Sequence, residues 1–88
     1  MRSNKNKDLD NNLNVVAGDY LRKVRELQNL TLEQIAVRVR TTRQNIYKYE
    51  TGKSRLKVDM FISICYALQL DPSQTYDAII EIAKQRGL

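Results

Sequence analysis

The sequence predicts an all-α fold, a compact bundle of five short helices, and two observations support this prediction. From Val15 onward, apolar residues recur three and four positions apart, the spacing that places them on one face of a helix. No stretch shows the strict alternation of a half-buried strand, and no internal repeat or interdomain linker is visible. The 88 residues are enough for one domain with a modest core.

The first fourteen residues, MRSNKNKDLDNNLN, differ in composition from the rest. Five of them are asparagine, and only Leu9 and Leu13 are large and apolar. Such a segment buries too little apolar surface to offset the entropy lost on ordering. We therefore expect residues 1–14 to form a disordered polar N-terminal arm and residues 15–88 to form the folded domain.

Capping signals place the helix boundaries. We expect helices at about 16–28, 32–39, 43–51, 58–68 and from residue 72 onward. Helix starts are marked by Thr31 with Gln34 in a capping box, by Thr42, and by Asp71 followed by Pro72. Helix ends are marked by Asn29, Gly52 and Gly87.

Each expected helix has an apolar stripe that we assign to the core. The stripes comprise Tyr20, Leu21, Val24 and Leu27; Leu32, Ile35, Ala36 and Val39; Ile46 and Tyr49; Phe61, Ile64, Cys65 and Leu68; and Tyr76, Ile79, Ile80 and Ala83. The third stripe is the narrowest, so the helix over 43–51 is expected to expose most of its surface.

Composition excludes several classes of function. The chain has no histidine and a single cysteine, so we expect no zinc or other metal site, no disulfide and no cofactor. The usual general base is also missing, and we expect no enzyme activity. No apolar run approaches the ~18 residues that span a bilayer, and residues 1–14 lack the apolar region of a signal peptide. We expect a cytoplasmic protein with no membrane partner and no evident small-molecule ligand.

Positive charge is concentrated in one segment. Residues 38–57 hold seven lysines and arginines and one acid, Glu50, for a net charge of +6. Because the whole chain carries +5, the other residues sum to −1. Such a concentration is typical of a face that binds a polyanion, although a solvated basic surface would look the same. The N-terminal arm is either an inert tail or a further contact to that polyanion, and Asp8 and Asp10 weaken the second interpretation.

The segment 31–52 predicts a helix-turn-helix, because two short helices are joined by about three residues and the second is polar. Projected at 100° per residue, its outward face carries Arg43, Gln44, Tyr47, Lys48 and Thr51. Arginine can bond guanine and glutamine can bond adenine in the major groove. Residues at the start of the recognition helix reach base edges first. We therefore expect double-stranded DNA as the partner.

The segment resembles the lambda-repressor-like helix-turn-helix family, also called the Cro/CI or XRE type. The resemblance covers about residues 16–70 and is carried by LTLEQIA at 30–36, TTRQNIYKYETGK at 41–53 and ALQLD at 67–71. It implies a bundle of four or five helices with the third in the major groove. It implies base contacts at Arg43, Gln44 and Lys48. Phosphate contacts are then expected at Thr31, Thr42, Tyr47, Lys53 and Arg55.

The family pattern also bears on an ion pair between the first and third helices and on the residue in the turn before the third helix. The family commonly pairs an arginine of the first helix with a glutamate near the end of the third, and these positions hold Arg25 and Glu50. The resemblance thus implies a structural ion pair, which would explain the single acid of the basic segment. The family often has glycine in the turn between the second and third helices, whereas this chain has Arg40. A left-handed conformation there costs a non-glycine residue ~1–2 kcal/mol, and we expect arginine to tolerate it in return for a phosphate contact.

Ala78 and Ile82 project from the fifth helix on the side opposite its core stripe, and we expect them to pack against a second copy of the chain. The leading hypothesis is a sequence-specific transcriptional regulator, a repressor that binds a palindromic operator as a homodimer. In the cell it would be nucleoid-associated when bound. The alternatives are a protein-interaction module that retains the fold, or an antitoxin-type autoregulator. The basic and amide groups on the outward face favour DNA.

Overall fold

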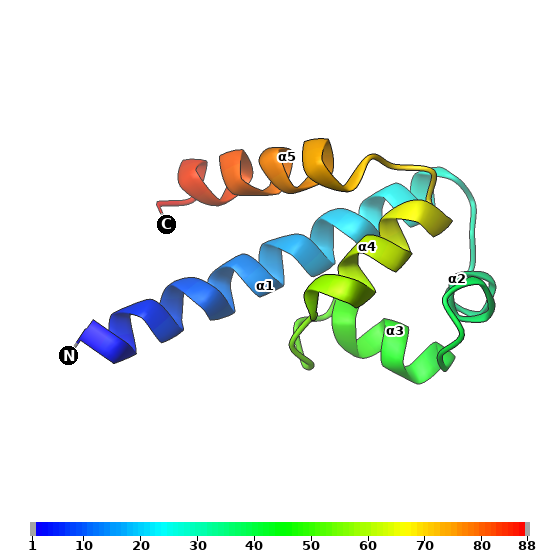
Figure 1. The fold of residues 1–88 in the computed structure, drawn as a ribbon, viewed down its shortest axis with the longest axis horizontal. Helices are drawn as coiled ribbons and strands as arrows, with labels where there is room; N and C mark the ends of the chain where they lie inside the picture. The colour runs from blue at the N-terminus through cyan, green and yellow to red at the C-terminus, as the bar shows by residue number, and fades with distance from the viewer. Residues whose placement is uncertain (1, 88) are drawn as a thin grey trace.

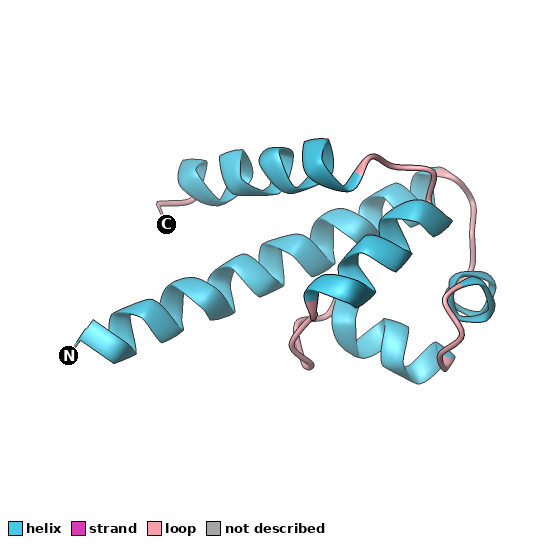
Figure 2. Ribbon diagram, in the orientation of Figure 1, coloured by secondary structure: helices cyan, strands magenta, loops and turns pink. Residues whose placement is uncertain are grey.

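The computed structural model describes the backbone of residues 2–87 and the side chains of residues 12–87. Its elements are α1 (Arg2–Leu27), α2 (Leu32–Arg38), α3 (Arg43–Glu50), α4 (Val58–Ala67) and α5 (Pro72–Gln85) (Figure 1). Figure 2 shows only helices and connecting loops over this part of the chain. The predicted all-α class with five helices is confirmed, and α2 to α5 begin at the expected residues.

The long helix α1 packs against α5 on one side and against α3 on the other. In Figure 1, α5 runs back along α1 so that both ends of the chain lie on the same side of the molecule. The helix α3 also packs on α1, whereas α4 packs on α5 and α2. No helix of the described residues is long and apolar enough to cross a membrane.

The N-terminal boundary differs from the expectation. The backbone of α1 is helical from Arg2, and the end of the supposed arm belongs to the folded domain. Leu13 packs on the core, while the Asn14 amide donates to the Ser54 carbonyl (3.2 Å) and accepts from the Leu56 N–H (2.8 Å). Composition could not reveal this, because asparagine here satisfies two backbone groups forty residues away. The arm prediction for the side chains of residues 1–11 lies outside the described residues.

The predicted N-caps are confirmed. The Thr31 hydroxyl accepts from the Gln34 N–H (3.1 Å) while the Gln34 amide oxygen accepts from the Thr31 N–H (2.8 Å), which completes the capping box. The Thr42 hydroxyl accepts from the Asn45 N–H (3.1 Å). Asp71 caps α5 by accepting from the Gln74 N–H, directly before the proline. These bonds satisfy helix-end N–H groups that would otherwise lack a partner.

The core consists of two clusters that share α1. The larger joins α1 to α2, α3 and α4, and its buried members are Leu21, Ile35, Ala36, Ile46, Ile64, Cys65 and Leu68. The smaller joins α1 to α5 through Val16, Ala17, Ile79 and Ala83. Since α3 packs on α1 while α2 packs on α3, the larger cluster fixes the orientation of the helix-turn-helix.

Two predicted core residues are exposed. Leu27 is 82% exposed because it ends α1, just before the chain turns away at Asn29, where φ is 58°. Tyr76 is 45% exposed because the buried face of α5 centres on Thr75, Ile79 and Ala83, each four residues apart. Its ring instead meets Phe61 edge-on, with centroids 6.1 Å apart.

Cys65 is expected to resist thiol reagents until the domain unfolds. Its side chain is fully buried, and burial raises the pKa of its thiol from 9.0 to about 11. Because the folded pKa is the higher one, stability from this neutral thiol is present below pH 9 and is lost as the pH rises toward 11. Labelling with Ellman's reagent at pH 8 should be slow in buffer and accelerate with added urea. Rapid labelling of the native protein would mean that Cys65 is accessible.

Candidate nucleic-acid interface

The helix α3 is attached to the core by one side and presents the other to solvent. Among its residues only Ile46 and Glu50 are buried, and Tyr49 is half-buried. The expected base-contacting residues Arg43, Gln44 and Lys48 are all exposed. Arg43 and Gln44 occupy the first turn of α3, the part of a recognition helix from which side chains reach base edges first.

The N-termini of α2 and α3 lie close enough to share a hollow. This hollow, of about 520 Å³, is lined by Leu32, Thr42, Arg43, Gln44 and Tyr47. The hydroxyls of Thr31 and Thr42 accept the capping bonds described above, and each still has its proton to donate. The expected phosphate-contacting threonines therefore stand exposed at two helix N-termini, where the peptide dipoles favour an anion.

The loop that joins α3 to α4, residues 51–57, is basic, and we call it the basic loop. The Lys53 ammonium lies 5.5 Å from the centre of the Tyr47 ring, so two expected phosphate contacts are neighbours. The Lys53 and Ser54 N–H groups both donate to the Lys48 carbonyl, which folds the loop back onto α3. Asn14 of α1 holds the loop from its other side. Arg55, in the same loop, is exposed.

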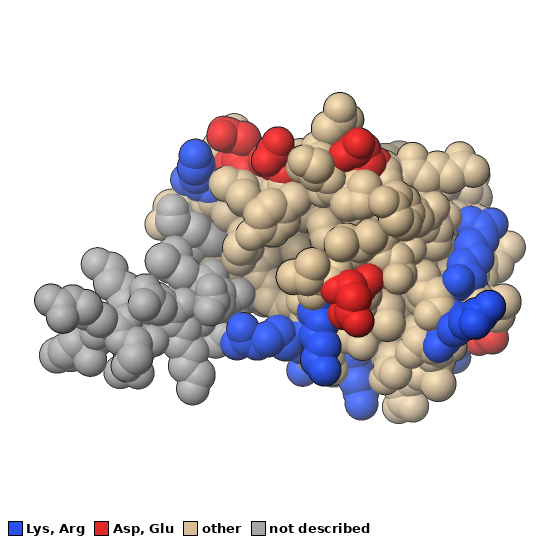
Figure 3. Space-filling model, viewed as in Figure 1, with Lys and Arg blue, Asp and Glu red and all other residues tan. Residues whose placement is uncertain are grey.

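Basic residues gather on the side of the molecule that carries α2, α3 and this loop. In Figure 3, most lysines and arginines lie along the lower and right-hand edges, with one more at the upper left, whereas aspartates and glutamates lie mostly along the upper edge, over α5. Within the described part of the chain, six of the seven basic side chains of the segment 38–57 form no side-chain hydrogen bond or ion pair. Arg38 is the exception, since its guanidinium donates to the Ala67 carbonyl at 2.9 Å and ties α2 to the end of α4.

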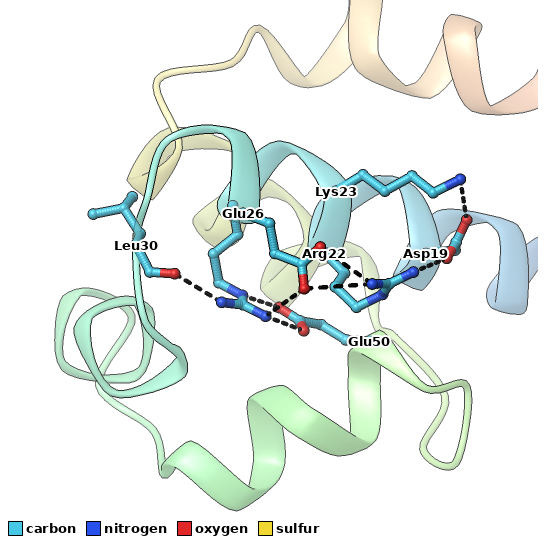
Figure 4. Close-up of polar contacts among 7 residues, drawn as sticks. Asp19, Arg22, Lys23, Glu26, Leu30 and Glu50 are labelled. Atoms are coloured by element: carbon cyan, nitrogen blue, oxygen red, sulfur yellow. Dashed lines mark hydrogen bonds and ion pairs between the residues drawn. The ribbon is translucent and has the colours of Figure 1, made fainter.

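The structure brings Arg25 and Glu50 together in a bidentate ion pair (Figure 4). The Arg25 Nε lies 2.7 Å from one Glu50 oxygen and its Nη2 lies 3.0 Å from the other. The third guanidinium nitrogen donates to the Leu30 carbonyl at 2.7 Å. Both side chains are nearly buried, with 11% and 7% exposed. The ion pair therefore joins α1, the α1–α2 loop and the end of α3, and the charge of Glu50 is compensated inside the domain.

A second group of charges in Figure 4 lies on the solvent side of α1. Asp19 contacts Arg22 at 2.7 Å and Lys23 at 3.2 Å, and the bond from Arg22 holds the pKa of Asp19 below its ordinary value. Glu26 contacts Arg22 at 3.2 Å and reaches the guanidinium of Arg25 at 4.0 Å. Because these groups are solvated, their pairs contribute little to stability.

The sequence analysis missed Gly18, which is buried where α1 crosses α3. A Cβ at this position would overlap the carbonyl oxygen of Tyr49 and lie 3.0 Å from that of Glu50. The backbones of the two helices thus meet at Gly18, next to the ion pair. A glycine inside a helix costs about 1 kcal/mol relative to alanine, so its presence there was an available signal of close packing.

The turn between α2 and α3 keeps the left-handed residue that the family pattern implies. Arg40 has φ of 60°, and its neighbours close the helix end with bonds from the Arg40 N–H to the Val37 carbonyl and from the Thr41 N–H to the Ala36 carbonyl. Similar conformations follow α1 at Asn29 and α4 at Gln69. Arginine therefore adopts the glycine conformation here, and its exposed side chain leaves the turn three residues before Arg43.

Replacing Arg40 with glycine is expected to change stability and DNA affinity in opposite directions. Glycine removes ~1–2 kcal/mol of left-handed strain, so the midpoint of urea unfolding should rise. Loss of one positive charge beside α3 should weaken DNA binding and lower the salt dependence by about one phosphate contact. Gln69→Gly, a similar change at the end of α4, should raise stability and leave DNA affinity unchanged. Unaltered binding by Arg40→Gly would mean that Arg40 makes no phosphate contact.

The expected dimer residues Ala78 and Ile82 are both half-buried, and their role in a dimer stays a prediction. Ile82 packs partly against the cluster around Ile79, within its own chain, and is not opposite the core stripe. Ala78 is half-buried on the same flank of α5. The buried face of this helix is turned relative to the stripe that we assigned, since Thr75 occupies a core position that we had given to Tyr76.

Two short helices joined by a tight turn, with the second exposed, basic and bordered by a basic loop, define a helix-turn-helix protein. A family model described as a helix-turn-helix domain matches residues 16–76. The match covers more than half of the chain, so the chain belongs to the helix-turn-helix family, as the resemblance to the XRE type implied. Membership of this family makes it a DNA-binding regulator of transcription and not an enzyme.

Solved structures of regulators share the fold. A crystal structure of the clp gene regulator ClgR from Corynebacterium glutamicum superposes with a TM-score of 0.72 at 21% identity, over 86% of this chain and 94% of that chain. A second ClgR structure gives 0.77 at 20% identity, over 84% and 79%. The restriction-modification controller protein C.AhdI from Aeromonas hydrophila gives 0.66 at 23% identity, over 78% and 97%. No curated protein sequence matches the chain.

Proposed function

We propose that this protein is a transcriptional repressor that binds a palindromic operator as a homodimer, with α3 in the major groove. The observation that carries the proposal is the exposure of Arg43, Gln44 and Lys48 on a helix held to the core only by its opposite side. We place the protein in the cytoplasm, associated with the nucleoid when bound.

Each part of the surface has a chemical role in this proposal. Arg43 donates two parallel bonds to a guanine, and Gln44 pairs with an adenine. Lys48, one turn further along α3, reaches a base edge in the same groove. The phosphates on either side are held by Thr31 and Thr42 at the helix N-termini and by Tyr47, Lys53 and Arg55 at the basic loop. Repression follows from occupancy alone, because a bound dimer excludes polymerase from the same DNA.

The proposal is tested by fluorescence anisotropy with DNA from the region upstream of the gene, against a scrambled duplex and over a salt series. We expect tight binding to the native fragment alone, with affinity falling steeply as salt rises. Half-sites should lie about one helical turn apart, ~34–36 Å. Equal and weak binding to both duplexes would contradict the proposal, because it would mean that the basic face binds DNA only through sequence-independent electrostatics.

Arg43→Ala and Lys53→Ala are expected to weaken binding in different ways. Loss of a base contact at Arg43 should cost ~1–3 kcal/mol on the operator and relax preference for one base pair. Loss of a phosphate contact at Lys53 should weaken binding to all sequences alike and lower the salt slope by about one. Competition with single-base operator variants distinguishes the two effects. A silent Arg43→Ala on a confirmed operator would mean that α3 is misplaced in the groove.

A further inference from the structure

We propose that Asn14 of α1 is a positioning residue for Arg55, and that its side-chain amide directs this arginine to a DNA phosphate. Asn14 acts through Arg55 and makes no contact to DNA itself. The inference rests on the phosphate contact that the proposed function gives to Arg55. It adds to DNA recognition a residue that lies outside both the helix-turn-helix and the basic loop.

The two hydrogen bonds of Asn14 fall on either side of Arg55. The Asn14 Nδ2 donates to the Ser54 carbonyl at 3.2 Å, and the Oδ1 accepts from the Leu56 N–H at 2.8 Å. These two backbone groups belong to the peptide units directly before and directly after the Arg55 Cα. Because each peptide unit is planar, holding both of them restrains φ and ψ of Arg55. The direction in which the arginine side chain leaves the backbone is restrained with them.

The surroundings of Arg55 offer few other restraints. Among the residues that the structure describes, no further hydrogen bond reaches residues 55–57 from outside the loop and α4. Leu56 adds an apolar anchor on one side, since its side chain packs against both core clusters. Ser54 and Leu56 are half-buried, whereas Arg55 between them is exposed. The Asn14 amide therefore connects both neighbours of an exposed cation to α1.

Lys53 provides an internal comparison, because the first half of the basic loop is held by different groups. The Lys53 and Ser54 N–H groups donate to the Lys48 carbonyl at 2.9 and 3.2 Å. These bonds start from α3 and do not involve Asn14. Loss of the Asn14 amide should therefore displace Arg55 and leave Lys53 in place. This difference between two bases of one loop is what the test measures.

The arrangement needs the chemistry of asparagine. One side chain must donate and accept at the same time, which an amide does, whereas a carboxylate only accepts and an aliphatic group does neither. Asparagine is also a poorer helix former than leucine, yet it occupies an interior position of α1. Asn14→Leu thus removes both hydrogen bonds at similar side-chain size and favours the helix.

The test is a double-mutant cycle on DNA affinity, measured with the full chain by fluorescence anisotropy on the upstream fragment and on the scrambled duplex. Asn14→Leu should weaken binding to both duplexes about threefold to tenfold, the range of one hydrogen bond. Base preference should not change, since phosphate contacts carry no sequence information. Added to Arg55→Ala, Asn14→Leu should have little further effect. Added to Lys53→Ala, it should keep its full effect.

Two controls separate this role from a general effect on the fold. Asn12→Leu is the matched substitution, since Asn12 lies on α1 two residues earlier and is exposed, and it should leave affinity unchanged. Amide hydrogen exchange followed by NMR gives a readout without DNA. The Leu56 N–H should exchange faster in Asn14→Leu than in the wild type. The Leu68 N–H, which donates to the Ile64 carbonyl at the end of α4, should keep its protection.

An equal loss of affinity from Asn14→Leu with and without Arg55 would overturn the proposal. Asn14 would then act on DNA directly or through the fold as a whole. A silent Arg55→Ala on both duplexes would overturn it as well, because Arg55 would make no phosphate contact for Asn14 to position.

Failure of this inference differs from failure of the proposed function. An additive cycle in a protein that prefers the upstream fragment would remove the positioning role and leave recognition by α3 intact. A coupled cycle in a protein that binds both duplexes equally would support the positioning role and contradict the proposed function.

Discussion

Glu50→Gln is expected to cost about 3–5 kcal/mol of unfolding free energy, which is much of what an 88-residue domain has. The substitution keeps the size of the side chain but removes the charge that compensates Arg25. The guanidinium is nearly buried and its remaining bond goes to the Leu30 carbonyl, so it would be left with an uncompensated charge. Urea unfolding followed by circular dichroism measures the loss.

The chain offers a matched control for this result. Glu26 also approaches Arg25, at 4.0 Å, but its side chain is 53% exposed. Glu26→Gln should change stability by no more than about 1 kcal/mol, because solvated pairs contribute little. Replacing both members of the buried pair, as Arg25→Met with Glu50→Leu, should recover most of the loss. Equal effects of Glu50→Gln and Glu26→Gln would show that burial of the pair contributes nothing.

Gly18→Ala is expected to destabilise the domain, although alanine is the better helix former. In an open helix this change stabilises by about 1 kcal/mol. Here the new methyl group would overlap the Tyr49 carbonyl, and two backbones would have to separate. Overpacking of this kind typically costs about 1–3 kcal/mol, and more where backbone opposes backbone. The sign of the change in unfolding free energy is therefore the test.

Gly87→Ala serves as the comparison. This glycine has φ of 88° and no atom within 4 Å of an added Cβ, so alanine there meets backbone strain without crowding. We expect a cost of ~1–2 kcal/mol at most. Gly18→Ala should also weaken DNA binding, since shifting α3 moves Arg43 relative to the basic loop. A stabilised Gly18→Ala variant would mean that α1 and α3 do not approach as closely as described.

Local signals predicted where α2, α3 and α5 begin, and the reason lies in capping chemistry, whereas α1 begins at Arg2, well before the expected residue 16. Thr31, Thr42 and Asp71 each bond an N–H three residues later, so a few adjacent letters determine where a helix begins. The pairing of Arg25 with Glu50 could not be obtained this way, because twenty-five residues separate them. It was available only from the resemblance to a family.

Contacts that depend on how helices cross were not predictable from the pattern. The stripe assigned to α5 was displaced because Thr75, a polar residue, takes a buried position beside Ile79. The same displacement explains why Ile82, which we placed opposite the core stripe, packs partly against the core of its own chain. The role of Asn14 was also missed. The composition of residues 1–14 is typical of a disordered arm, whereas the Asn14 amide bonds two backbone groups of a loop that is distant in sequence.

The bonds from Asn14 determine how the basic loop behaves when a duplex arrives. The side-chain amide of Asn14 bonds both Ser54 and Leu56. These two bonds hold the loop that carries Lys53 and Arg55 in one conformation. Its conformational entropy is lost when the domain folds and need not be lost again on DNA. The rigidity of this loop thus depends on Asn14 of α1, a residue outside the helix-turn-helix itself.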